Sequence, residues 1–261
     1  GKGRHGLAVF YFMPKFDTET TPYSRLATIY DYVMRHVDYV HWAHYVSSLL
    51  ARHKVKPNRV LDLACGTGSL AIELYRQKFD VLGADGCREM LDIAVDKVRK
   101  LHYPIPFYHR NLLDLGDLPA CDTVLCLYDS INYLRSPEMI AHALEEVHRI
   151  VNPNGIFVVD ICTESNSRQY FSNMQSEDSG DGFSYRRHSY YEKGVQYNKF
   201  DIHFEDTDEV IKEVHQQRIY SLTAIEEIVD KSPFEMVGAY GGFGYAPPTE
   251  FSDRVHFVLK K

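Results

Sequence analysis

Residues 60–68 read Val-Leu-Asp-Leu-Ala-Cys-Gly-Thr-Gly, a short apolar run that leads into a turn with glycine at two positions. The run is typical of a buried strand, and Leu70 and Leu74 of the next segment have helical spacing. Glycine lets the backbone pass close to a ligand because it has no side chain. In sheets whose strands alternate with helices, ligands bind at the carboxyl ends of the strands. This strand, turn and helix therefore predict a ligand site at one edge of an α/β sheet.

The alternation of strand and helix continues to Ile161. Further strand-like runs occur at 81–84, 107–109, 123–127 and 156–161, and helical stripes occur at 69–78, 88–101 and 136–151. The last helix starts with Ser136 as N-cap and Pro137 as first helical residue, both of which are preferred at those positions. Such alternation indicates a mainly parallel sheet with helices on both faces.

The residues before and after this alternating region have different patterns. Residues 24–53 have the apolar spacing of helices. Residues 164–182 are rich in Ser, Asn, Asp and Gly, which is typical of a loop. Three strands of a small antiparallel sheet are expected next, at 183–192, 195–205 and 209–220.

The C-terminal part returns to the first sheet. Thr223 to Glu226 fits a capping box that starts a helix to Asp230. Two closing strands, at 234–240 and 255–260, bring the main sheet to seven strands. We expect the chain to divide into an N-terminal segment (1–56), a main domain (57–163 and 221–261) and an antiparallel β insertion (164–220).

Composition narrows the class of function. The 261 residues carry a formal charge of −7, from 29 basic and 36 acidic residues, which argues against a broad cationic surface for nucleic acid. No apolar run is long enough for a membrane helix, and the run Leu7–Met13 is too short for a secretory signal. The five cysteines form no C-x-x-C pair and are interpreted as free thiols of a cytoplasmic protein.

The glycine turn admits two interpretations. Gly66, Gly68 and Ala71 satisfy the loose dinucleotide pattern G-x-G-x-x-G/A, which would suit a nicotinamide-dependent dehydrogenase. Asp62, however, lies within the first strand, four residues before Gly66. Together with the Ala-Cys-Gly-Thr-Gly turn, this aspartate resembles motif I of class I S-adenosylmethionine (SAM)-dependent methyltransferases. The resemblance implies an α/β Rossmann-like, doubly wound, seven-stranded mixed sheet and SAM as cofactor, with S-adenosylhomocysteine as product.

The strand ends supply further candidate cofactor residues. Asp85 ends the second strand, where a carboxylate can accept both hydroxyls of a ribose. By resemblance, Met90 lies against the adenine, and Asn111 stands where many relatives have Asp. Its amide oxygen can accept the same hydrogen bond. The full set of expected SAM-binding residues is Tyr30, Trp42, Asp62, Ala64, Gly66, Gly68, Asp85, Gly86, Met90, Asn111, Leu112, Leu127 and Tyr128.

Two other motifs resemble a subgroup of bacterial small-molecule methyltransferases. One is the run Asp129-Ser130-x-Asn132-Tyr133-Leu134, and the other is the N-terminal pattern Tyr23, Tyr30-Asp31 and Asp38-Tyr39-x-x-Trp42. The resemblance starts at about Thr21. It implies that the N-terminal helices form a lid over the cofactor, with Tyr30 and Trp42 in it, and that the antiparallel insertion follows the fifth strand.

No general base stands out. His148 is expected on a helix surface, and His188, Tyr190, His203 and His215 fall in the insertion, where an acceptor site could form. Tyr185, His188, Tyr190 and His203 are the residues that we expect to orient a polar acceptor. No histidine and acid spacing suggests a metal site.

The resemblance thus predicts an enzyme that transfers a methyl group from SAM to nitrogen or oxygen of a small molecule by direct displacement. An RNA or protein methyltransferase, a dehydrogenase and a non-catalytic SAM-binding protein are alternatives. Asp62 and the Ala64-Cys65-Gly66 turn speak against the dehydrogenase. The insertion either selects the acceptor or forms the interface of a homodimer, and the sequence leaves both open.

Overall fold

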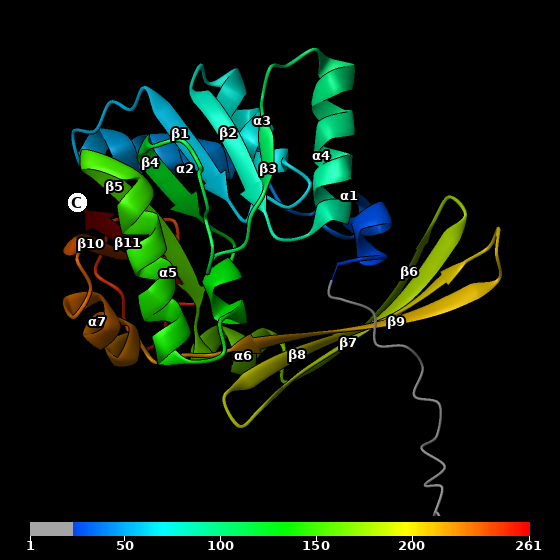
Figure 1. Ribbon diagram of the computed structural model, residues 1–261. Coiled ribbons are helices and arrows are strands. Elements are labelled where there is room, and N and C mark those ends of the chain that lie inside the picture. The colour runs from blue at the N-terminus through cyan, green and yellow to red at the C-terminus, as the bar shows by residue number, and fades with distance from the viewer. Residues whose placement is uncertain (1–22) are drawn as a thin grey trace, which may run out of the picture.

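The computed structural model describes residues 23–261 of the chain (Figure 1). The expectations for Leu7–Met13, for Thr21 and for the rest of residues 1–22 lie outside this part. Within it, a seven-stranded sheet has the order β10-β11-β5-β4-β1-β2-β3. Its strands are β1 Arg59–Leu63, β2 Asp80–Asp85, β3 Phe107–His109, β4 Cys121–Cys126, β5 Val151–Cys162, β10 Glu235–Gly241 and β11 Arg254–Lys260. The strands β1 to β5 pair in parallel, whereas β11 is antiparallel to β5 and to β10.

Helices cover both faces of this sheet, which confirms the predicted α/β Rossmann-like fold. One face packs on α5 (Pro137–Ile150) and α7 (Leu222–Asp230), and the other packs on α2 (Tyr39–Arg52) and α3 (Ser69–Arg76). The helix α4 (Arg88–Leu101) lies beside β2 and β3. The central strands are buried on both sides because each face is covered, as their unbroken apolar runs require.

Local signals fix where the helices begin. The Ser136 hydroxyl accepts a hydrogen bond from the Met139 backbone N–H at 3.3 Å, as predicted. For α7 the predicted start at Thr223 is wrong, because Ser221 is the N-cap and accepts from the Ala224 N–H at 3.1 Å. Either residue type can cap a helix, and the packing of Ile225 and Val229 into the core decides between them.

A separate four-stranded antiparallel sheet lies beside the first, with the order β6-β7-β8-β9 (Figure 1). Its strands are β6 Asn173–Gly180, β7 Phe183–Glu192, β8 Val195–Phe204 and β9 Glu209–Arg218. The loop predicted for 164–182 is wrong, since α6 (Glu164–Tyr170) and β6 occupy it. The strand β6 is an edge strand that pairs with β7 along its whole length but buries almost no side chain, so its sequence has the polar composition of a loop.

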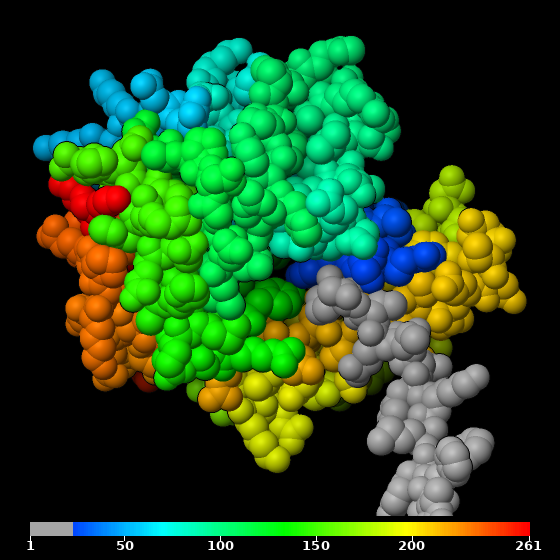
Figure 2. Space-filling model, viewed as in Figure 1, coloured from blue at the N-terminus to red at the C-terminus, as the bar shows by residue number. Residues whose placement is uncertain are grey.

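The N-terminal segment is broken into short pieces. A 3-10 turn, η1 (Leu26–Ile29), leads into α1 (Tyr30–Val33), and α2 starts anew after Asp38, whose carboxylate accepts from the His41 N–H at 2.9 Å. The helical pattern predicted for residues 24–53, with its second stretch from about His41, is therefore interrupted at 34–38. Apolar side chains of η1 and α1 pack on β7 and β8, in a cluster that contains Leu26, Ile29, Val33, Phe183, Tyr185, Phe200 and Ile202. Figure 2 shows this segment between the α/β part and the four-stranded sheet.

Candidate active site

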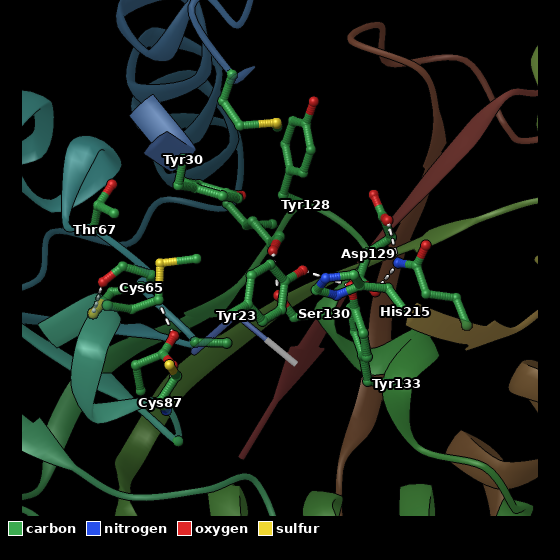
Figure 3. A pocket seen from close by; sticks show the side chains of 18 of the residues that line it. Tyr23, Tyr30, Cys65, Thr67, Cys87, Tyr128, Asp129, Ser130, Tyr133 and His215 are labelled. Atoms are coloured by element: carbon green, nitrogen blue, oxygen red, sulfur yellow. Dashed lines mark hydrogen bonds between the residues drawn. The ribbon is translucent and has the colours of Figure 1, made fainter. Parts of the chain in front are cut away.

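A cavity of about 960 Å³ lies where three parts of the chain meet. It is lined by the turns that follow β1, β2 and β4, by the N-terminal segment, and by one face of β7, β8 and β9. The volume is at the upper end of the range for small-molecule sites. In Figure 3, Cys65, Thr67 and Cys87 lie on one side of the cavity, and Asp129, Tyr133 and His215 lie on the other.

The glycine turn after β1 opens onto this cavity. Ala64, Gly66 and Gly68 all have positive φ, at 61°, 54° and 75°. A side-chain carbon added to Gly66 would meet nothing within 4 Å, so the backbone there faces open space. Gly68 has a different role, because the same carbon would lie 3.0 Å from the Phe107 ring. Gly68 does not line the cavity; it lets α3 pack closely against β3 and α4.

Two carboxyl groups stand at the ends of β1 and β2. Asp62 is only 3% exposed, and its Oδ2 has no hydrogen-bond partner among the described residues. Burial and the nearby charge of Asp85 raise the pKa of Asp62 to about 7. Asp85 accepts hydrogen bonds from the backbone N–H groups of Gly66 and Cys87, each at 2.8 Å. Burial also raises the pKa of Asp85, although these hydrogen bonds oppose the change.

The residues that follow β2 and β3 form a wall of the cavity that is apolar at its centre and polar at its edge. Met90 is buried, and it lines the cavity together with Gly86, Asn111 and Leu112. The Asn111 side-chain oxygen already accepts from the Leu113 N–H at 2.8 Å, so only its second lone pair is open to a ligand.

Aromatic rings form another wall of the cavity. The Trp42 and Tyr128 rings lie 5.5 Å apart, and the Arg254 guanidinium lies 5.3 Å from the first ring and 5.0 Å from the second. Burial raises the pKa of Tyr128 to about 12 and that of Tyr30 well above its ordinary value, so both hydroxyls stay neutral.

The N-terminal segment is fastened over the glycine turn by polar contacts. The Thr67 hydroxyl donates to Asp31 Oδ1 at 2.6 Å. Lys97 Nζ donates to Asp31 Oδ2 and to Ser69 Oγ, both at 2.8 Å. These contacts tie the turn after β1 and the helices that follow it to α1.

A chain of polar side chains forms the opposite end of the cavity. The hydroxyls of Tyr23 and Tyr133 lie 2.5 Å apart, and the Tyr133 hydroxyl lies 3.3 Å from Nδ1 of His215 (Figure 3). Nε2 of His215 lies 3.3 Å from Oε2 of Glu213. Burial raises the pKa of Tyr133 and of Tyr23. Burial alone would raise the pKa of Glu213, but the His215 imidazole and two backbone N–H groups lower it.

Strained backbone marks the turn after β4. Tyr128 and Asp129 have φ of 62° and 54°, which non-glycine residues adopt only under constraint. Their N–H groups donate to the Asp160 carboxylate at 3.1 and 2.8 Å. Arg254 forms ion pairs with Asp129, at 2.6 Å, and with Asp160. These carboxylates and Arg254 therefore hold the turn, and Tyr128 with it, in place.

Comparisons with known proteins bear on the family and the fold. Residues 60–155 match the family model described as a methyltransferase domain. The "Putative methyltransferase YqeM" of Bacillus subtilis (strain 168) is 28% identical over 255 residues, which cover 92% of this chain and 97% of that protein. A SAM-dependent methyltransferase structure from Clostridium acetobutylicum ATCC 824 has a TM-score of 0.78 at 23% identity and covers 91% of this chain and 98% of its own. The sugar N-methyltransferase KedS8 from Streptoalloteichus sp ATCC 53650 has a TM-score of 0.75 at 18% identity, with 100% and 99% covered.

The chain belongs to the class I SAM-dependent methyltransferase superfamily. Its cofactor is SAM. The site of this methyltransferase fits such a molecule: Asp62 offers an unpartnered buried carboxylate oxygen to a cation, and Gly66 leaves space for close approach. Of the thirteen residues expected from the sequence, all except Gly68 line the cavity.

Three of the four acceptor residues expected in this methyltransferase, His188, Tyr190 and His203, lie on the face of the small sheet that is turned away from the cavity, whereas Tyr185 shares the face of Arg187. Tyr185, His188, Tyr190 and His203 do not line the cavity. Tyr185 is buried under the N-terminal segment, and His203 pairs with Asp208 at 2.8 Å. The residues of the sheet that do line it are Arg187, Gln196, Asn198, Phe200, His215 and Gln217. Gln196, Asn198 and Phe200 alternate along β8 and so share one face, but the sequence does not reveal that this face meets the cavity.

His148 is partly buried on α5, with its ring 5.0 Å from that of Phe234, and it does not line the cavity. Within residues 23–261 of the methyltransferase, no three His, Cys, Asp or Glu side chains are grouped to hold a metal ion. The helices of the same region are all too short or too polar to cross a membrane.

Proposed function

We propose that this methyltransferase transfers a methyl group from SAM to a nitrogen or oxygen atom of a small molecule that binds against β7, β8 and β9. The observation that carries the proposal is the continuity of one cavity, from the turn after β1 to the polar face of the small sheet. A cavity of about 960 Å³ suits a cofactor together with a small acceptor. A sugar N-methyltransferase is among the structures of similar fold, which supports an acceptor of this size.

The cofactor is proposed to bind in the half built by β1 and β2. The Asp85 carboxylate would accept the ribose hydroxyls, and Asp62 would pair with the ammonium group. Met90 and Leu112 would pack on the adenine, with the open lone pair of Asn111 at its edge. Tyr30, Trp42 and Tyr128 would cover the cofactor and exclude water. When bound, SAM supplies a methyl group on a positively charged sulfur, which a nucleophile displaces directly.

The acceptor's proton is proposed to leave through Tyr133 and His215. The imidazole faces Tyr133 with Nδ1, and its Nε2 lies 3.3 Å from a carboxylate oxygen of Glu213, so Glu213 would orient the ring. Because burial raises the pKa of Tyr133, its hydroxyl would act as a relay. It would take the proton from the acceptor and give its own to His215. Tyr133 would then be the catalytic residue, and His215 and Glu213 would act through it.

A metabolite extract incubated with methyl-labelled SAM would test this function. We expect a labelled small molecule, identified by mass spectrometry, from the parent protein. Asp85→Ala should give little product and should bind S-adenosylhomocysteine about 10- to 150-fold more weakly, for the loss of charge-assisted hydrogen bonds. Label found only in RNA or protein, or tight cofactor binding with no product in any extract, would contradict the proposal.

A further inference from the structure

Arg187, in the middle of β7, is a cation in the cavity wall. Its side chain is partly buried and lines the end of the cavity formed by the small sheet. Nε donates to the Ser189 hydroxyl at 3.0 Å, and Nη2 donates to the Asn198 side-chain oxygen at 2.8 Å. The guanidinium lies 5.4 Å from the Phe171 ring and 5.5 Å from the Phe200 ring. The hydrogen-bond partners and the rings around this guanidinium are therefore all neutral.

No carboxylate of residues 23–261 forms an ion pair with Arg187. Arg254, which also lines the cavity, differs in this respect, because it pairs with both Asp129 and Asp160. The carboxylate of Glu213, in the same sheet, is already occupied by His215 and by backbone N–H groups. A guanidinium stays charged in proteins, and a buried charge without a counterion is costly. Burial accordingly lowers the pKa of Arg187.

We propose that Arg187 binds an anionic group of the methyl acceptor, a carboxylate or a phosphate. This rests on the proposed function, which puts the acceptor at this end of the cavity. Two of the five N–H groups of the guanidinium are used by Ser189 and Asn198, and Nη1 makes no hydrogen bond within the described residues. The free N–H groups can bind a carboxylate or phosphate in the forked geometry that arginine favours.

The support around Arg187 is itself fixed. The Ser189 hydroxyl donates to the same Asn198 oxygen at 2.7 Å, and both residues are buried. The two rings stabilise the plane of the guanidinium. The charge of Arg187 also acts on the hydroxyls of Tyr128 and Tyr133, where it opposes the rise in pKa that burial causes. An anion on Arg187 would thus hold its molecule near Tyr133, through which the acceptor's proton is proposed to leave.

The first test uses turnover. A metabolite extract is divided by anion exchange, and both fractions are incubated with the protein and methyl-labelled SAM. We expect the labelled product from the retained fraction. Arg187→Gln should raise the acceptor KM at least about tenfold, with cofactor affinity unchanged. Arg186→Gln is the matched control, because Arg186 is its exposed neighbour on the opposite face of β7. Phosphatase treatment of the retained fraction separates the sources: a phosphate acceptor is lost and a carboxylate acceptor remains.

The second test needs no turnover, so it separates failure of this inference from failure of the proposed function. The protein saturated with S-adenosylhomocysteine is titrated with acetate and with inorganic phosphate at constant ionic strength. Trp42, the single tryptophan, lines the cavity and reports binding by fluorescence. We expect saturable binding of at least one anion, absent in Arg187→Gln and present in Arg186→Gln. A labelled product from the unretained fraction alone, or anion binding that is absent or survives in Arg187→Gln, would overturn the inference.

Discussion

The carboxyl groups of Asp62 and Asp85 stand close enough for the charge of one to raise the pKa of the other. Burial is the larger cause, and together the two effects bring the pKa of Asp62 to about 7. A carboxyl group with this pKa exchanges its proton near neutral pH. A cation bound beside Asp62 would favour the ionised form, so cofactor binding and the protonation of Asp62 should be linked.

Cofactor affinity should therefore depend on pH. As pH falls through about 7, Asp62 takes up a proton and can no longer pair with an ammonium group. The affinity for S-adenosylhomocysteine should drop about tenfold between about pH 7 and pH 5.5. Asp62→Asn should bind more weakly at neutral pH and show a flat profile over that interval. Calorimetric titrations at several pH values would check both; an equally steep profile in Asp62→Asn would assign the effect to another group.

The same substitution should stabilise the protein without cofactor. The folded-state pKa of Asp62 is above its ordinary value, so the native state binds more protons than the unfolded chain between about pH 4 and pH 7, and stability contributed by the neutral form is lost as pH rises through about 7. Asp62→Asn removes the cost of burying a charge. We expect a gain of up to about 4 kcal/mol in the free energy of unfolding at about pH 8, and little change at about pH 4. Urea unfolding at both pH values measures this.

Tyr133→Phe should impair the transfer step and leave cofactor binding intact. Removing the hydroxyl breaks the path from the acceptor to His215, and proton transfer by a placed side chain contributes roughly 10²- to 10⁴-fold. We expect kcat to fall by at least about 100-fold and the pH dependence of kcat to change. Tyr190→Phe, on a ring that does not line the cavity, is the control and should behave like the parent. Equal effects of both substitutions would mean that the loss is structural.

Asp31→Ala should speed the release of the cofactor. Asp31 accepts from the Thr67 hydroxyl at 2.6 Å and from Lys97 at 2.8 Å, so it fastens the N-terminal segment to the glycine turn. The ion pair is partly exposed and contributes at most about 1 kcal/mol to stability. We expect the dissociation rate of S-adenosylhomocysteine to rise about 3- to 10-fold. Stopped-flow fluorescence of Trp42 would measure it, and an unchanged rate would show that Asp31 does not hold the segment closed.

The sequence predicts the main sheet well because its central strands are buried on both faces and the helices that cover it carry an apolar stripe. The helix α4 has the predicted limits, Arg88 and Leu101. The strand β6 was missed for the opposite reason, since an edge strand held by backbone hydrogen bonds needs no apolar pattern. The division of the chain into three segments and the cofactor contacts stay predictions.

The acceptor end could not be predicted as well, because it depends on which face of a strand meets the cavity. A shift of one residue turns every side chain to the other face, and composition does not reveal the choice. His188 and Arg187 are neighbours in sequence, yet only Arg187 lines the cavity. His215 is 2% exposed, and its role becomes visible only when Tyr133, 82 residues away, lies beside it.

The Glu213 carboxylate has two sets of partners. It accepts the backbone N–H groups of Tyr23, Arg25 and Leu26, at 2.9, 2.7 and 2.9 Å, and it also lies against His215. One carboxylate thus anchors the segment that is proposed to cover the cofactor, and it also lies beside the imidazole next to Tyr133. If that segment swings away to admit substrate, Glu213 loses three donors at once and its basicity changes. The protein would then have an open state, which admits substrate, and a closed state, in which Glu213 holds the segment and lies beside His215. Methyl transfer would occur only in the closed state.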